Sequence, residues 1–209
     1  WLQKGNEMDK ILVVSDHAKQ TFTNTKATVK NEHTGETFPY QLNKPVDVVW
    51  ETTPRTEKEE ICELKLDYDF NFLMVSQMGP RKNFENALKW WVEEFIDQVI
   101  KRVISSYGDR KCKVYLLHGD LSSGQMVGLY TNPKIKALVN IAHGEGFGLP
   151  MFEAAREGLP IVTIGWSGQQ DFLIHKGKNY YQHVDFTMQP VQPFAVWEGV
   201  IEKDSMWAY

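Results

Sequence analysis

Between residues 70 and 165, short apolar runs alternate with stretches of helical periodicity, and no other feature constrains the fold as much. The apolar runs predict strands at 70–75, 113–117, 137–142 and 160–164. Apolar positions over 88–103 recur about every 3.6 residues, which predicts a long amphipathic helix. Shorter helices are expected before Tyr130 and over 150–156. Strands separated by helices favour a parallel sheet covered on both faces, so we predict an α/β, doubly wound, Rossmann-like fold.

The first fifty residues have a different pattern. The expected elements are a strand at 10–14, a short helix capped by Ser15 and running through Phe22, a hairpin over 28–42 and a strand at 45–50. A polar stretch with a proline follows at 52–58. We therefore place a boundary near Trp50, with a linker or hairpin appendage over 1–50 and the main domain over 51–209.

The composition excludes several classes of protein. The net charge of −4 argues against a broad nucleic-acid surface. Two distant cysteines, Cys62 and Cys112, give neither a disulfide framework nor a zinc motif, so we expect no metal and a reducing, cytoplasmic location. No apolar run reaches the roughly 20 residues of a membrane span. Because the sequence starts without methionine, we expect it to be a segment of a longer protein.

The segment 143–155 carries the strongest chemical signal. A predicted strand meets a predicted helix there through three glycines, and Pro150 suits the first helical turn. Free backbone N–H groups and the positive end of a helix dipole make an anion site, which suits a diphosphate. Glu145 precedes this helix, and Glu153 projects one turn into it, where its carboxylate can accept hydrogen bonds from hydroxyls. For either glutamate alone, an ordinary acidic residue near a helix start is an equally good interpretation.

Other loops at the carboxyl ends of the predicted strands converge on the same crevice. Arg81 and Lys82 follow the strand at 70–75, and their charge can neutralise phosphate without a metal. Gly119 lies in the next such loop, and 165–169 forms another, with small and amide residues. An isolated pair of cations is also typical of a solvated helix start, so position on the crevice is what favours function.

These residues resemble a known signature. The segment 143–155, followed by Gly-Leu-Pro-Ile-Val at 158–162, resembles the motif of retaining GT-B glycosyltransferases of group 1, the glycogen-synthase-like or family 4 type. That motif is a glutamate, Gly-Phe-Gly-Leu-Pro and a second glutamate. The segment 75–83 resembles the family's strand leading into a phosphate-binding lysine, and 11–22 resembles the end of its N-terminal domain. The resemblance covers nearly the whole chain and implies the C-terminal half of a GT-B architecture with part of the N-terminal domain attached.

The resemblance also implies roles for particular residues. Glu145 would lie beside the donor sugar as the catalytic residue, and Glu153 would hold the ribose hydroxyls. Lys82, with Arg81, would bind the diphosphate. Backbone groups would come from Gly146, Phe147, Gly148 and Leu149, and Gly119 would line the donor site. Many family members carry an arginine where Gln77 stands, so part of the phosphate-binding charge is missing or supplied by Arg81.

The function that follows is the transfer of a hexosyl group, with retention, from a nucleotide-activated sugar to an acceptor hydroxyl. We expect no cofactor beyond the nucleotide-diphosphate sugar, which is a substrate. The acceptor, a glycan, lipid or protein, would be chosen by a preceding domain, which could also give peripheral membrane contact. Two alternatives stay open, namely a nucleotide-sugar-binding module without turnover and a GT-B-fold nucleotide-sugar epimerase. The chain alone is expected to be inactive if that preceding domain is required.

Overall fold

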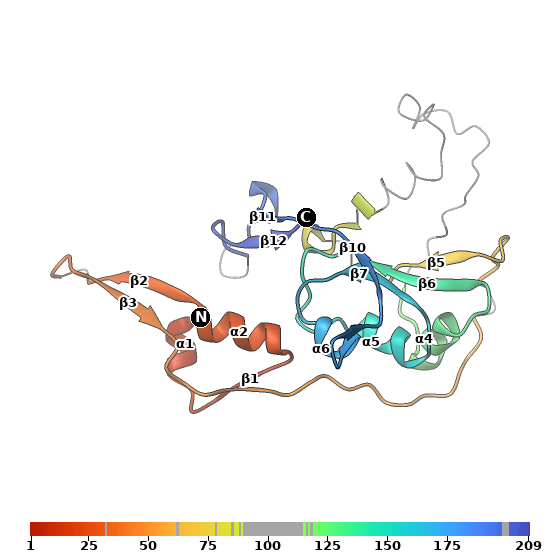
Figure 1. Ribbon diagram of the computed structural model, residues 1–209, viewed down its shortest axis with the longest axis horizontal. Helices are drawn as coiled ribbons and strands as arrows, with labels where there is room; N and C mark the ends of the chain where they lie inside the picture. Colours follow the sequence, from red (N-terminus) through yellow and green to blue (C-terminus); the bar gives the residue numbers. More distant parts are fainter. Residues whose placement is uncertain are drawn as a thin grey trace, which may run out of the picture.

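The computed structural model of the chain describes all residues except 32, 62, 78, 85, 88, 90–114, 116, 118 and 198–200. The structure leaves undescribed nearly all of the helix predicted over 88–103, most of the strand predicted at 113–117, and both cysteines. Figure 1 shows the central sheet with helices below it, a smaller unit built from the first fifty residues, and the strands β11 (Met188–Pro190) and β12 (Met206–Ala208) above.

The central sheet consists of four parallel strands in the order β10, β7, β6, β5. They are β5 (Asn71–Leu73), β6 (Ile135–Asn140), β7 (Ile161–Ile164) and β10 (Gln182–Val184). The prediction of a parallel α/β sheet is confirmed at this level. The described helices α4 (Ser123–Tyr130), α5 (Leu149–Arg156) and α6 (Gln170–Leu173) lie together on one side of the sheet in Figure 1. The doubly wound GT-B arrangement stays a prediction.

The main core lies between this sheet and the helices. Leu138 of β6 and Met151 and Ala154 of α5 have no exposed surface, and Leu173 of α6 closes the same cluster. Burial of each larger side chain in this cluster, such as Leu138 or Met151, stabilises the fold by about 1.5–3 kcal/mol. The apolar face of α5 therefore fixes the helix over β6 and β7. As a result, the first turn of α5 lies at the carboxyl ends of the strands.

The first fifty residues form their own small core around Leu2, Val13, Leu42 and Val46. The elements are α1 (Leu2–Asn6), β1 (Ile11–Val13), α2 (Asp16–Asn24), the hairpin β2 (Lys26–Lys30) and β3 (Thr37–Gln41), and β4 (Val46–Val48). β1 pairs in parallel with β4, and β2 pairs with β3 antiparallel. The predicted helix cap at Ser15 is confirmed, because its hydroxyl accepts a hydrogen bond from the Ala18 N–H at 3.1 Å. The boundary near Trp50 stays a prediction.

An irregular segment after β4 runs along the helical face. Arg156 at the end of α5 donates to the Thr53 side chain at 2.6 Å and to its carbonyl at 3.2 Å. Farther along, the Glu59 carboxylate accepts from the Ser122 hydroxyl at 2.6 Å, beside the start of α4. These contacts fasten the connection to the outer surface of α5 and α4.

The C-terminal region adds short pieces that the sequence did not predict. They are β8 (Ile174–His175), β9 (Lys178–Asn179), β11 (Met188–Pro190), a 3-10 helix at Pro193–Ala195 and β12 (Met206–Ala208). β11 and β12 pair antiparallel around a third core cluster that includes Trp207. The consequence for the site is that β12 returns to the loop that follows β6.

Candidate functional site

The junction between β6 and α5 has the predicted local geometry. Gly148 caps the helix with a φ of 95°, a left-handed conformation that favours glycine, and Pro150 lies in the first turn. Phe147 is buried, and its ring lies 5.1 Å from that of Phe172 and 5.4 Å from that of Phe152. Gly146 is exposed and Leu149 half-buried. Packing of Phe147 thus anchors a turn in which Gly146 is exposed, whereas Gly148 is buried.

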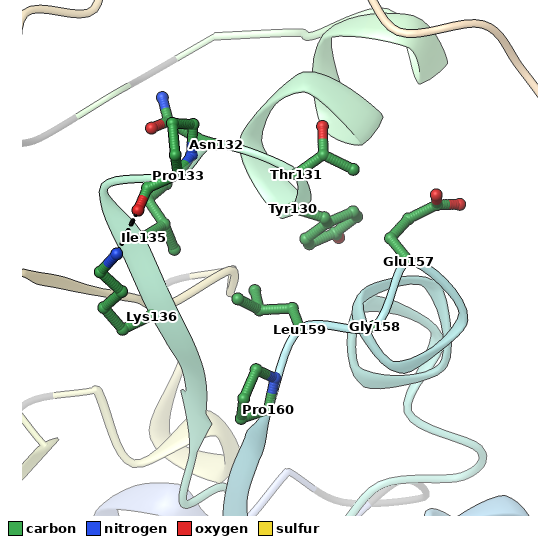
Figure 2. A pocket seen from close by; sticks show the side chains of 10 residues that line it. All are labelled: Tyr130, Thr131, Asn132, Pro133, Ile135, Lys136, Glu157, Gly158, Leu159 and Pro160. Atoms are coloured by element: carbon green, nitrogen blue, oxygen red, sulfur yellow. Dashed lines mark hydrogen bonds between the residues drawn. The ribbon is translucent and has the colours of Figure 1, made fainter.

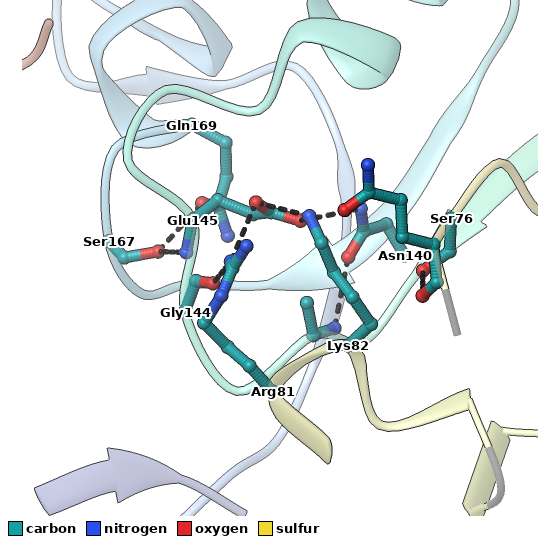
Figure 3. A network of polar contacts seen from close by, with 10 residues as sticks. Ser76, Arg81, Lys82, Asn140, Gly144, Glu145, Ser167 and Gln169 are labelled. Atoms are coloured by element: carbon teal, nitrogen blue, oxygen red, sulfur yellow. Dashed lines mark hydrogen bonds and ion pairs between the residues drawn. The ribbon is translucent and has the colours of Figure 1, made fainter. Parts of the chain in front are cut away.

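Glu145 is the centre of the charged cluster in Figure 3. Its carboxylate is buried, with a side-chain exposure of 7%. Lys82 donates to its two oxygens at 2.5 and 2.7 Å, and Arg81 donates to one of them at 3.0 Å. Arg81 also donates to the Gly144 carbonyl at 2.5 Å. The structure therefore brings together the two predicted cations and the first predicted glutamate, as one ion-paired group with an excess of positive charge.

The two cations come from a 3-10 helix, Pro80–Lys82, which follows the end of β5. The Arg81 carbonyl accepts from the His143 N–H at 2.8 Å, which joins this helix to the loop after β6. The side chain of Lys82 is mostly buried, at 17% exposure, while Arg81 keeps 43%. Of these two cations, Lys82 is thus the one less screened by solvent, and Arg81 is the more exposed.

Three polar residues that the sequence did not single out as ligands hold Glu145 in place. The Ser167 hydroxyl accepts from the Glu145 N–H at 2.8 Å and donates to the Gln169 side chain at 2.9 Å. Asn140, the last residue of β6, approaches the Glu145 carboxylate at 3.5 Å. A polar residue at the end of an apolar strand is the signal that points to Asn140. Ser167 and Gln169 lie in the loop at 165–169, which was expected to line the crevice.

The loop after β7 is packed tightly on the Glu145 backbone. The Gly168 N–H donates to the Glu145 carbonyl at 3.0 Å. A Cβ added at Gly168 would overlap the carbonyl of Gly146. Because backbone meets backbone here, neither loop can shift alone.

His143 links the site to β12. Its ring is buried and stacked against Trp207, with centroids 4.1 Å apart, and Nδ1 lies 2.5 Å from the Ala208 carbonyl oxygen. Burial lowers the pKa of His143, although the hydrogen bond with the Ala208 carbonyl opposes this shift. His143 therefore acts as a neutral packing residue near neutral pH.

The remaining predicted site residues lie outside this network as the structure describes it. The Glu153 carboxylate accepts from the Tyr130 hydroxyl at 3.0 Å, between α5 and α4. Burial and the Glu153 carboxylate both raise the pKa of Tyr130, so its hydroxyl stays a donor. Gly119 is exposed, with a φ of 133°. Its neighbour His118 lies outside the described residues. The roles of Glu153 and Gly119 stay predictions.

A hollow of about 380 Å³ lies at the opposite end of the sheet. Figure 2 shows the ten residues that line it, around the end of α4 and the starts of β6 and β7. The charged members are Lys136, whose ammonium donates to the Pro133 carbonyl, and Glu157, which pairs with Arg156 at 2.9 Å. Both charges are thus paired with neighbouring residues, and neither has a described contact with the group formed by Arg81, Lys82 and Glu145.

Two further observations concern the described residues. They contain no group of three or more histidine, cysteine, aspartate or glutamate side chains arranged to hold a metal ion. Within the same part of the chain, no helix is long and apolar enough to cross a membrane.

Comparison with known proteins gives a distant likeness to a solved structure. No family model and no curated protein sequence matches the chain. A solved structure described as "Crystal structure of GtfA/B complex" aligns with 96% of this chain, at 17% identity and a TM-score of 0.48. The chain spans 38% of the length of that protein chain. A likeness this distant carries no argument about function, so function is argued from the residues of the site.

Proposed function

We propose that this chain binds the nucleotide-activated donor of a glycosyltransferase and takes part in hexosyl transfer, with retention, to an acceptor hydroxyl. The observation that carries the proposal is the group formed by Arg81, Lys82 and Glu145, beside the glycine turn that begins α5. It lies at the carboxyl ends of parallel strands, where ligands of open α/β sheets bind. The resemblance of 143–155 to the glycosyltransferase motif names the ligand.

A diphosphate suits the charges of this group. Arg81 and Lys82 both pair with the single carboxylate of Glu145, which leaves one positive charge unbalanced. A bound anion would be attracted by this charge. The free N–H groups at the start of α5 would add hydrogen bonds and the helix dipole. Binding of a diphosphate would draw Lys82 and Arg81 away from Glu145 and leave its carboxylate beside the sugar.

The proposed transfer needs stabilisation of the leaving group. The bond between the anomeric carbon and the phosphate oxygen breaks, and its electron pair leaves with the diphosphate. The acceptor oxygen bonds to that carbon from the same face, and its proton passes to a phosphate oxygen. Cations and amide dipoles fixed around the diphosphate stabilise the developing negative charge, which is the largest effect available to such a site. Lys82 and Arg81 would supply this charge in place of a metal.

The first test is a ligand-observed NMR screen of the chain against common nucleoside diphosphates, their sugar conjugates and inorganic pyrophosphate. We expect binding of at least one diphosphate, retained in EDTA and weakened by Lys82→Ala. Lys136→Ala, which changes a lysine in the hollow at the other end of the sheet, is the matched control. Absence of binding to every diphosphate, or equal losses in both variants, would overturn the proposal.

A second assay separates transfer from binding alone. The chain is incubated with the sugar conjugate that binds, and the release of free nucleoside diphosphate is measured. Release in the presence of an acceptor supports the transferase. Binding without release indicates a binding module or a chain that needs the preceding domain for turnover, and conversion of the sugar without release indicates an epimerase.

A further inference from the structure

The Asp171 carboxylate joins the main domain to the first fifty residues. One of its oxygens accepts two hydrogen bonds, from the Asp16 backbone N–H at 2.8 Å and from the Trp50 indole N–H at 2.9 Å. Asp16 is the first residue of α2, and Trp50 follows β4. Both donors therefore belong to the N-terminal unit, and the acceptor belongs to α6 of the main domain.

The same junction contains ring and apolar contacts. The His17 ring meets the Trp166 ring edge to face, with centroids 4.8 Å apart. Val14 lies so close to Gly146 that a Cβ added there would be 3.5 Å from a Val14 methyl group. The turn between β1 and α2 thus lies directly over the glycine turn of the candidate site.

The chemistry of the junction makes Asp171 its critical residue. A carboxylate beside the first turn of α2 satisfies a free N–H group and complements the positive end of the helix dipole. Loss of the carboxylate would remove the acceptor of two donors from different elements at once. No other described side chain accepts from both.

A short path leads from Asp171 to Glu145. Asp171 follows Ser167, Gly168 and Gln169, and its own N–H donates to the Gly168 carbonyl at 3.3 Å. Ser167 and Gly168 hold the Glu145 backbone on both sides, at 2.8 and 3.0 Å. Gly168 also packs so closely on the Gly146 carbonyl that no Cβ would fit between them. A shift of the loop that bears Asp171 would therefore also shift the glycine turn.

We propose that Asp171 is a positioning residue that couples docking of the N-terminal unit to the anion site at Glu145, Lys82 and Arg81. It accepts from Asp16 and Trp50, and its loop fixes the Glu145 backbone. The N-terminal unit thereby helps to hold the glycine turn and the ion-paired group in their binding geometry. The effect on anion binding rests on the function proposed above, whereas the docking of the unit does not.

The test combines a measurement without ligand and a measurement with one. Hydrogen exchange of the peptide that contains the Asp16 amide reports docking. Binding of inorganic pyrophosphate, followed by phosphorus NMR, reports the anion site. The variants are Asp171→Ala, Asp171→Asn, which keeps an acceptor oxygen, and Trp50→Phe. The matched controls are Asp204→Ala, at an exposed aspartate, and Trp197→Phe, at an exposed tryptophan.

In Asp171→Ala we expect exchange at Asp16 to accelerate about tenfold and the Kd for pyrophosphate to rise about fivefold. Asp171→Asn should recover most of both, and Trp50→Phe should give a smaller change in the same direction. The two controls should match the unchanged protein. If Asp171→Ala fails to fold by circular dichroism, Trp50→Phe decides the matter, because it removes one of the two donors to Asp171, and unchanged exchange at Asp16 in that variant then overturns the inference.

Three outcomes would overturn the inference. Unchanged exchange at Asp16 in both Trp50→Phe and Asp171→Ala shows that there is no docking contact. Faster exchange with an unchanged Kd shows a contact that does not reach the anion site. If the unchanged protein binds no pyrophosphate, the proposed function and the coupling both fail, while the exchange data still decide the docking.

Discussion

The two ends of the central sheet differ in what they bring together. At the carboxyl ends, loops after three strands bring charged and amide side chains together around the buried carboxylate of Glu145. At the amino ends, a hollow of about 380 Å³ is open, but its two charges are engaged by near neighbours. Among the described residues, the hollow and the charged group therefore lie at opposite ends of the sheet. Ligands of open α/β sheets bind at the carboxyl ends of the strands, so the charged group and not the hollow is the candidate site.

The largest expected effect compares one glycine from each end. Gly168→Ala would place a methyl group onto the Gly146 carbonyl and cost about 3 kcal/mol of unfolding free energy. Gly158→Ala, in the lining of the hollow, meets open space and only strains a φ of 82°, at about 1 kcal/mol. Urea denaturation measures both. Equal costs would mean that the two ends are packed alike.

The next effect concerns the lysine at each end. Lys82→Ala removes a charged donor and should weaken pyrophosphate binding by about 1.5–3 kcal/mol, or roughly tenfold or more. The loss should shrink at high salt, because salt screens the attraction that the variant lacks. Lys136→Ala should leave the Kd unchanged at every salt concentration. Titration calorimetry gives both values, and a loss in Lys82→Ala that does not vary with salt would argue against a charge role.

A third measurement assigns Glu153, which lies between the two ends. If its carboxylate holds ribose hydroxyls, Glu153→Gln should weaken the binding of a nucleoside diphosphate by about 1 kcal/mol and leave the binding of pyrophosphate unchanged. Tyr130→Phe removes the hydroxyl that donates to Glu153 and should lower the unfolding free energy by about 1 kcal/mol with little effect on binding. If both variants bind the nucleotide as tightly as the unchanged protein does, Glu153 has a structural role beside the hollow and does not contact the ribose.

The smallest effect is on pH dependence. Burial lowers the pKa of His143, so below about pH 6.5 the unfolded chain binds more protons than the folded chain does. Stability should therefore fall as pH drops from 6.5 through the folded pKa, by at most about 1.4 kcal/mol per pH unit for this residue. His143→Phe keeps an aromatic ring against Trp207 and should flatten the dependence. Urea midpoints at pH 7.5, 6.5 and 5.5 test this, and an unchanged slope would exclude His143 as the cause.

The sequence predicted those parts of the fold that depend on neighbours along the chain. β6, α5 and β7 follow from apolar runs, Pro150 and Gly158, all of which act over a few residues. The short strands from β8 to β12 were not predicted, since each has only two or three residues and little apolar pattern. Nearly all of the helix predicted over 88–103 lies outside the described residues, so that helix stays a prediction.

The site was predicted in part. Placement of Arg81, Lys82 and Glu145 at one edge follows from the rule that parallel strands end together, and the structure brings them into contact. The direct ion pairing among them was not predicted, because it depends on side-chain packing. The hydrogen bond between Trp50 and Asp171 joins residues 121 positions apart, so no local sequence pattern indicates it. Such contacts are set by tertiary structure alone.

The pairing of His143 with Ala208 has a consequence for how the protein is made. His143 follows β6 directly, but the carbonyl that its ring contacts lies 65 positions later in the chain. On a ribosome that adds about 5–20 residues per second, β6 and the residues around Glu145 emerge seconds before their last support. Until then the Trp207 stack is missing and the loop bearing His143 is incompletely held. Closing so long a loop is among the slower steps of folding, so the candidate site should be one of the last parts of a newly synthesised molecule to become ordered.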